Sequence, residues 1–266
     1  MTRQSSNWAA VDSSADPQRL VTGLDALRAE PFFVQSKERI AAVIAHAGAT
    51  RVLDVGCGTG EDAAEFERAG RAAIGIENSK TMCTEARRRD PNLLLAAGDA
   101  LGLPIATGSV NAVRADRVLQ HLHDAPTALR EWRRALAHDG ILVSFDPDLT
   151  TATIDGVDPR TAATILDWRL GTRGGASTVH NLAGALRAAG FSDVHVETLT
   201  LDLADLGRAD EMMGLPRWGD GAAGAGALPR PDARRWHDDV HAAARRGTLR
   251  YRCTYLLGTG RAGPPR

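Results

Sequence analysis

Three glycines alternate at the end of a short apolar run. Residues 52–55 are followed by Gly56, Gly58 and Gly60, and a helical pattern starts at Glu61. Glycine tolerates positive φ and lets a ligand approach the backbone closely, and the first turn of a helix offers unpaired N–H groups. Parallel α/β sheets bind ligands where their strands end in this way. The pattern predicts a ligand-binding turn rather than a plain strand-to-helix connection.

Two carboxylates follow the next two β-rich runs. Glu77 ends the run at 72–77, and Asp99 follows the run at 93–97. A carboxylate at the first position can accept hydrogen bonds from both hydroxyls of a ribose. One at the second position can accept a hydrogen bond from an adenine amino group. Each alone could be a solvated loop residue, but together they predict an adenosine site.

These residues need a scaffold, and the chain alternates between β-rich and helical patterns. Strands are expected at 51–55, 72–77, 93–97, 110–115, 141–145, 194–201 and 250–257. Helices are expected within 17–47 and at 61–69, 79–88, 126–137, 161–170 and 181–189. This rhythm is typical of a parallel sheet with helices on both faces.

The chain is expected to form one domain over residues 1–266, with helical lid insertions. Its parts would be a loose tail at 1–16, N-terminal helices at 17–47, a cofactor-binding core at 48–146, and substrate-lid insertions at 147–180 and 205–246. The glycine-rich centre of the second insertion, 219–226, is expected to be flexible. Three tryptophans in the insertions could line a substrate pocket or pack the lid itself: Trp168, Trp218 and Trp236.

The motifs resemble those of the class I S-adenosyl-L-methionine (SAM)-dependent methyltransferases. The matching segments are 52–60, 74–82, 98–100, 116–122 and 136–145. Within this class, the sequence is most similar to the ubiquinone/menaquinone-methyltransferase-like branch, which acts on small molecules and natural products. The resemblance implies an α/β, Rossmann-like fold with a seven-stranded sheet of order 3-2-1-4-5-7-6, in which strand seven, here 250–257, is antiparallel.

The resemblance also implies where the methionine part of SAM would lie. Asp54 would orient this end through a water or a donor, and Arg117 and Val118 would line the sulfonium side. The backbone of the turn would pack against the methionine part at Gly56, Cys57 and Gly58. The thiol of Cys57 is not expected to react.

The adenosine part would be held by the two following motifs. Glu77 would bind the ribose, and Asn78 and Met82 would flank the adenine. Asp99 and Ala100 would read the edge of the adenine ring.

Methyl transfer needs little covalent help, because alignment of the acceptor with an activated methyl group supplies much of the rate gain. A general base is needed only if the acceptor must lose a proton. His121, which follows the cofactor segment, is the first candidate for this catalytic role, and His123, Asp146 and His180 come next. Alternatively, His121 only packs or holds the SAM carboxylate.

The composition limits the classes of partner that the protein is expected to bind. The formal net charge of −1 lacks the basic surplus of nucleic-acid-binding proteins, and no apolar segment is long enough to cross a membrane. The three cysteines have neither disulfide nor metal-ligand spacing, so we expect no metal and a cytoplasmic location. The expected oligomeric state is a monomer or a homodimer.

The predicted function is SAM-dependent methyl transfer to a small molecule of secondary metabolism, with S-adenosyl-L-homocysteine as product. An NAD-dependent oxidoreductase would need a glycine where Glu61 stands. A nucleic-acid methyltransferase that modifies amino groups would carry an Asn/Asp-Pro-Pro-Tyr/Phe motif after the fourth strand, which is missing. A non-catalytic SAM-binding protein, or a SAM enzyme of another reaction type, would show the same cofactor motifs.

Overall fold

A seven-stranded mixed sheet forms the centre of the protein. The computed structural model describes residues 11–14 and 16–263. The strand order is β3-β2-β1-β4-β5-β7-β6, and β7 runs antiparallel to both of its neighbours. The strands are β1 (Arg51–Val55), β2 (Ala72–Glu77), β3 (Leu95–Ala97), β4 (Val110–Asp116), β5 (Leu136–Asp155), β6 (Phe191–Leu203) and β7 (Arg250–Ala262). The predicted fold class and strand order are confirmed.

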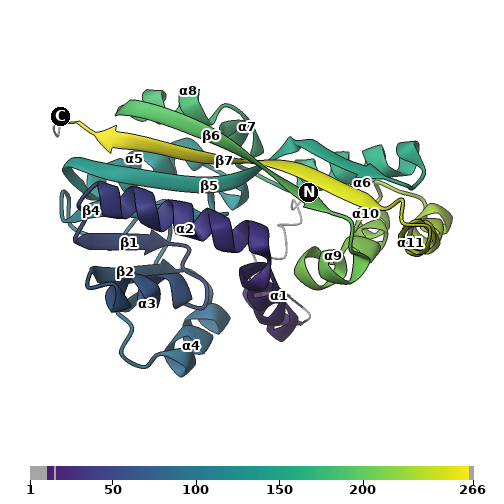
Figure 1. Cartoon of the computed structure of the whole chain (residues 1–266), viewed down its shortest axis with the longest axis horizontal. Coiled ribbons are helices and arrows are strands. Elements are labelled where there is room, and N and C mark those ends of the chain that lie inside the picture. The colour runs from purple at the N-terminus through teal and green to yellow at the C-terminus, as the bar shows by residue number, and fades with distance from the viewer. Residues whose placement is uncertain (1–10, 15, 264–266) are drawn as a thin grey trace.

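Helices cover both faces of this sheet and extend past one end of it (Figure 1). The α-helices are α1 (Pro17–Ala29), α2 (Pro31–His46), α3 (Glu61–Arg68), α4 (Lys80–Arg89), α5 (Ala125–Ala135), α6 (Pro159–Gly171), α7 (Ala176–His180), α8 (Leu182–Ala188), α9 (Leu206–Met213), α10 (Trp218–Gly224) and α11 (Arg230–Arg245). Short 3₁₀ helices are η2 (Leu119–His121) and η3 (Leu215–Arg217). No helix in the described part of the chain has the length and hydrophobicity needed to cross a membrane.

Alternation along the strands places two hydrophobic cores on opposite faces of the sheet. Val52 joins the core that contains Ile40 of α2. Its neighbour Leu53 joins the other core, with Leu129 and Trp132 of α5. The central strands are therefore buried on both faces, which explains their nearly continuous apolar sequences.

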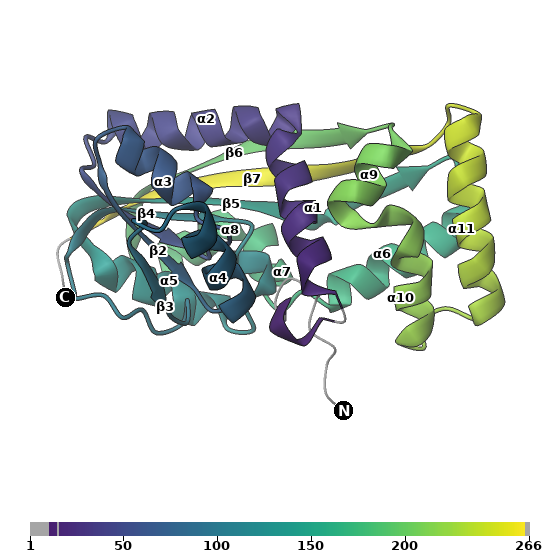
Figure 2. The same cartoon turned by 90° about the horizontal axis from the view of Figure 1, so that it is seen from below.

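Strands β5, β6 and β7 continue beyond the other strands as a ribbon. The pairing of β5 with β7 is irregular between Asp148 and Thr153 and then resumes, with Ile154 opposite Tyr251. Helices α6, α9, α10 and α11 lie around this ribbon (Figures 1 and 2). The sequence predicted that the fifth strand ends at Phe145. Residues 147–180 were expected to hold a loop and then a helix at 161–170, whereas β5 continues to Asp155. Pro147 and the polar residues after it hide the continuation, which the irregular pairing accommodates.

The centre of the second insertion is helical, so the prediction of a flexible segment at 219–226 is wrong for most of it. A Cβ on Gly219 would lie 2.8 Å from Cδ1 of Trp236, and one on Gly221 would lie 2.5 Å from Cη2 of Trp168. These glycines let α10 approach the two indole rings closely. Trp218 and Trp236 are buried and Trp168 packs against the same core, so the tryptophans pack the lid.

Removing the Trp236 side chain should destabilise the protein strongly. This residue is 1% exposed, and its Nε1–H donates to the carbonyl oxygen of Leu215 at 3.2 Å. Trp236→Ala is expected to lower the free energy of unfolding by about 3–5 kcal/mol, because the cavity it leaves cannot close fully. Urea denaturation measures this loss. The control Leu94→Ala, at a side chain that is 57% exposed, should change it by no more than about 0.5 kcal/mol.

Candidate active site

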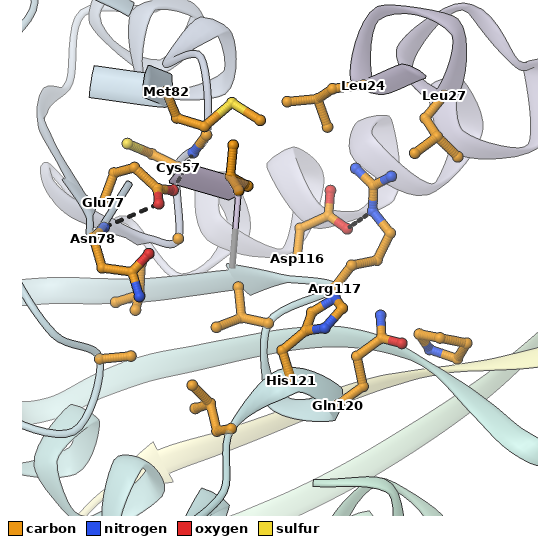
Figure 3. A pocket seen from close by; sticks show the side chains of 18 of the residues that line it. Leu24, Leu27, Cys57, Glu77, Asn78, Met82, Asp116, Arg117, Gln120 and His121 are labelled. Carbon is orange, nitrogen blue, oxygen red and sulfur yellow. Dashed lines mark hydrogen bonds and ion pairs between the residues drawn. The ribbon is translucent and has the colours of Figure 1, made fainter. Parts of the chain in front are cut away.

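A cavity of about 470 Å³ lies where β1, β2 and β4 end, between α1 on one side and α6 and α9 on the other. A volume of this order suits a small-molecule ligand. Its wall includes every predicted cofactor residue except Asp54: Gly56, Cys57, Gly58, Glu77, Asn78, Met82, Asp99, Ala100, Arg117 and Val118. Figure 3 shows Glu77, Asn78 and Met82 on one side and Asp116, Arg117 and His121 on the other.

The glycines of the turn are needed both for backbone conformation and for space. Gly56 has a φ of 65°, and a Cβ there would lie 2.6 Å from Cγ2 of Val118. Gly60 has a φ of 83°, and a Cβ there would lie 2.3 Å from Cδ2 of Leu93. The N–H of Gly56 donates to the carbonyl oxygen of Ile76 at 2.8 Å, which fixes the turn to β2.

The side chain of Cys57 packs against the sheet. A Cβ on Gly75 of β2 would lie 2.6 Å from the sulfur of Cys57. Burial raises the pKa of this thiol, so it stays protonated at neutral pH. Both observations fit the expectation that Cys57 acts through its backbone.

Glu77 organises the turn as well as facing the cavity. Its Oε2 accepts a hydrogen bond from the N–H of Gly58 at 2.9 Å, and its Oε1 accepts from the N–H groups of Asn78 and Ser79, each at 2.9 Å. Burial raises the pKa of Glu77, and these three donors oppose that rise by favouring the carboxylate. The carboxylate therefore sets the position of the glycine turn relative to β2.

The segment after β3 is held in a defined conformation. Oδ1 of Asp99 accepts from the N–H of Leu101 at 2.9 Å, and the carbonyl oxygen of Ala100 accepts from Nε1 of Trp132 at 3.0 Å. Across the cavity, Met82 is 3% exposed and packs against Val11. These contacts hold Asp99, Ala100 and Met82 in defined positions on this part of the cavity wall.

An N-terminal segment adjoins this part of the cavity, with Val11 on the wall. Asp12 accepts hydrogen bonds at the start of α4 from Ser79 Oγ at 2.8 Å, the N–H of Lys80 at 2.8 Å and the N–H of Thr81 at 3.0 Å. These bonds, that from Thr81 foremost, hold the pKa of Asp12 below its usual range. The predicted loose tail is thus wrong for residues 11–14, and residues 1–10 and 15 lie outside the described part.

A buried arginine on the central strand β4 anchors the other end of the cavity. Arg114 is 3% exposed and donates to Asp54 at 2.6 Å, to Asp62 at 2.7 Å and to Asp116 at 2.8 Å. Burial opposes ionisation of Asp116, but Arg117, Lys37 and Arg114 hold its pKa at about 2. This ionic cluster supplies fixed charges of both signs at the cavity wall.

The N-terminal helices join the same ionic cluster. Arg28 of α1 donates to Asp62 at 2.8 Å, and Lys37 of α2 pairs with Asp62 and, at 3.5 Å, with Asp116. Burial opposes ionisation of Asp62, but Arg114, Lys37 and Arg28 hold its pKa below the usual range. Sequence reasoning did not find this cluster. Arg114 was a usable signal, because a charged residue in the middle of an apolar strand needs a partner.

Asp54 lies behind the cavity wall, fully buried. Its Oδ1 pairs with Arg114, whereas its Oδ2 accepts no hydrogen bond from any described residue. Burial raises the pKa of Asp54 to about 6, against the effect of Arg114. Such an oxygen needs a donor from a water or a bound ligand, which fits the predicted indirect role.

His121 ends η2 and projects into the cavity (Figure 3). Burial lowers its pKa well below the usual value, and the positive charges of Arg173, Arg117 and Arg169 lower it further. The imidazole is therefore neutral at physiological pH. Arg117, just before this helix, has a φ of 59°, and its N–H donates to the carbonyl oxygen of Phe145 at 2.6 Å. This bend turns the chain from β4 toward the cavity.

The other candidate bases occupy different positions. His123 is exposed and lies on the cavity wall. Asp146 is fully buried behind it, accepts from the N–H of Gln120 at 3.2 Å, and has a pKa that burial raises to about 8. His180 does not line the cavity and contacts Asp148 at 3.0 Å. The structure thus brings only the two neighbouring histidines to the cavity.

The two predicted insertions, 147–180 and 205–246, and strand β7 contribute further residues to the cavity wall, none of which the sequence analysis named as site residues. Those on the cavity wall are Pro147, Leu149, Arg169, Arg173, Met212, Met213, Tyr251 and Tyr255. Both predicted insertions are represented, together with β7. In the part of the chain that the structure describes, no group of three His, Cys, Asp or Glu residues could hold a metal ion.

Comparisons with known proteins agree with this architecture. Residues 53–144 match the family model of a methyltransferase domain. An uncharacterized protein in a Streptomyces fradiae transposon is 37% identical over 204 residues, which cover 71% of this chain and 57% of that protein. A demethylmenaquinone methyltransferase of Beutenbergia cavernae is 38% identical over 93 residues, which cover 35% of this chain and 39% of that enzyme.

A solved structure shares the fold. It is the phosphoethanolamine N-methyltransferase 2 of Haemonchus contortus in complex with S-adenosyl-L-methionine, with a TM-score of 0.59 at 14% identity. The similarity covers 98% of this chain and 61% of that one. The chain therefore spans less than two thirds of the length of these relatives.

Glu77 offers a direct test of the adenosine site. Glu77→Gln keeps the size of the side chain but replaces one acceptor oxygen by a donor, so we expect SAM binding to weaken by about 1.5–3 kcal/mol, the range for hydrogen bonds to a charged group. Calorimetric titration measures this change. Glu38→Gln, at an exposed position on α2, is the matched control and should bind SAM normally. An unchanged dissociation constant in Glu77→Gln would exclude Glu77 as the ribose ligand.

Proposed function

We propose that this chain, which belongs to the class I SAM-dependent methyltransferases through residues 53–144, transfers the methyl group of SAM to a small-molecule acceptor and releases S-adenosyl-L-homocysteine. The observation that carries the proposal is that one cavity has both the cofactor motifs and lid residues on its wall. A cofactor and an acceptor bound in that cavity would be in contact.

The residues present fit SAM at both of its ends. Glu77 faces the side that would hold the ribose. The ionic cluster, of which Asp116 and Arg117 line the cavity, offers partners for the charged amino-acid end, and Asp54 could reach that end through a water. When bound, SAM supplies a methyl group that is already activated on a sulfonium. The protein must therefore hold the reactants in line and exclude water, which accounts for a large share of the rate gain in such reactions.

His121 is proposed to accept the proton of the acceptor. It projects into the cavity as a neutral imidazole, which is the form that a base requires. Gln120 and Leu119 lie before it on η2, and the N–H of Gly175 donates to the carbonyl oxygen of Gln120 at 3.2 Å. A Cβ on Gly175 would lie 1.7 Å from the carbonyl oxygen of Leu119, so the lid segment fits closely against this helix and fixes it.

Two alternative functions fit the cavity less well. Glu61 lies on its wall at the start of α3, where its Oε2 accepts from Thr59 at 2.5 Å. A carboxylate there would repel the pyrophosphate of NAD. A nucleic-acid substrate would have to pass the cover formed by Leu24 and Leu27 of α1 and Met212 of α9. These observations favour a small-molecule acceptor.

We further propose that the protein is cytoplasmic and acts in secondary metabolism. Its three cysteines are buried and unpaired, which agrees with a reducing environment. The cavity volume of about 470 Å³ agrees with an acceptor of small size.

Binding of SAM tests the proposal directly. We expect calorimetric titration to give roughly micromolar dissociation constants for SAM and for S-adenosylhomocysteine, and no binding of NAD. Methyl transfer from labelled SAM to members of a compound panel should follow. Binding of NAD without binding of SAM would reject the proposal, and tight SAM binding without transfer to any acceptor would favour a non-catalytic role.

Substitution of His121 tests the catalytic role. His121→Ala should lower kcat roughly 100-fold or more and leave SAM affinity nearly unchanged, because the base acts on the acceptor. The pKa of His121 is lowered, so the rate should be constant through neutral pH and fall only in acid, where the imidazole becomes protonated. His195→Ala, at an exposed position on β6, is the control. Loss of SAM affinity in His121→Ala would assign His121 to cofactor binding.

A further inference from the structure

Two arginines on the lid side of the cavity have no acidic partner. Arg169 lies in the last turn of α6, Arg173 follows just after that helix, and both line the cavity. Among the described residues, no carboxylate lies within 4.0 Å of either guanidinium. The Nε of Arg173 is buried and has no hydrogen-bond partner in the described part of the chain. Their positive charges are thus uncompensated.

The surroundings of the two side chains are apolar and aromatic. The guanidinium of Arg169 lies over the ring of Trp218, with Cζ 3.6 Å from the ring centroid. Burial lowers the pKa of Arg169 to about 10. Burial, together with the charge of Arg169, lowers the pKa of Arg173 to about 9. Both remain charged at neutral pH. Burying a charge without a partner costs several kcal/mol, and the stacking on Trp218 offsets part of this cost at one residue only.

The remaining cationic side chains of the cavity differ from this pair. Arg28, Lys37, Arg114 and Arg117 each pair with at least one carboxylate. Unpaired positive charge therefore occurs on the lid side, away from the ionic cluster that would face the amino-acid end of the cofactor. Arg169, Arg173 and the proposed base His121 all line this one cavity.

We propose that Arg169 and Arg173 bind an anionic group of the methyl acceptor, either a carboxylate or a phosphate, and that the rest of the acceptor is apolar. Guanidinium groups pair with the oxygens of both anions, often through two parallel hydrogen bonds. The same cavity wall includes Leu149 and Met212, and Tyr251 packs against the Trp218 ring on which Arg169 stacks, which suits a hydrophobic body. This inference rests on the proposed function, because it assumes that the cavity holds a methyl acceptor.

The experiment compares anionic probes with neutral probes of the same shape. The full chain is saturated with S-adenosylhomocysteine and titrated calorimetrically, at constant ionic strength in chloride, with benzoate, benzamide, phenyl phosphate and benzyl alcohol. At least one anion is expected to bind ten or more times more tightly than its neutral counterpart. Preference for benzoate identifies a carboxylate site, and preference for phenyl phosphate identifies a phosphate site.

Variants connect this preference to the two arginines. Arg169→Gln combined with Arg173→Gln should abolish it and leave the affinity for S-adenosylhomocysteine unchanged. Arg160→Gln, at an exposed position in the first turn of α6, should retain it. If the double variant does not fold, Arg169→Lys and Arg173→Lys, which keep the charge but lose the paired hydrogen bonds, should each weaken anion binding severalfold.

Two results would overturn the inference alone. One is equal binding, or no binding, of anionic and neutral probes to a chain that binds S-adenosylhomocysteine. The other is a double variant that loses S-adenosylhomocysteine but still prefers anions, which would assign the arginines to the cofactor. A wild-type chain that does not bind S-adenosylhomocysteine would instead overturn the proposed function, and this inference with it.

Discussion

The site depends on the ion pairs that the buried side chain of Arg114 makes with three carboxylates. This side chain extends from the central strand β4 and holds Asp54 of β1, Asp62 of α3 and Asp116 at the end of β4. Removing one partner of a buried ion pair commonly costs about 3–5 kcal/mol, because the remaining charge is left without compensation. The three carboxylates hold the strand ends, the first helix after the glycine turn and the N-terminal helices in one arrangement. The shape of the cavity follows from this arrangement.

The part of the cavity wall that lies toward α6 and α9 is built on the same sheet as the glycine turn. Strand β5 pairs with β4 through the core and then continues with β7 under the lid helices. Leu149 of β5 and Tyr255 of β7, which line the cavity, therefore belong to strands that also form the central sheet. The continuous strands thus connect the two parts of the cavity wall through the sheet.

Local patterns in the sequence predicted residues that meet on one cavity wall, and long-range packing determined what these patterns missed. The glycine turn and Glu77 were recognisable because strand ends, turns and helix starts are encoded by neighbouring residues. Two of the three partners of Arg114, Asp54 and Asp62, lie 60 and 52 residues away in the sequence, so no local pattern reveals them. Gly219 and Gly221 suggested flexibility, since glycine usually loosens a helix, but here they make room for two indole rings. The contribution of each glycine depended on residues far away in the sequence.

The helix α1 lies over the glycine turn and contributes Leu24 and Leu27 to the cavity wall. Cδ2 of Leu24 would lie 3.0 Å from a Cβ on Gly58. The helix is attached at one end through Arg28 to Asp62, and the segment before it is attached through Asp12 to the start of α4. Release of a bound nucleotide past α1 would require these attachments to open. Where product leaves past a mobile element in this way, the opening step rather than the chemistry can limit turnover.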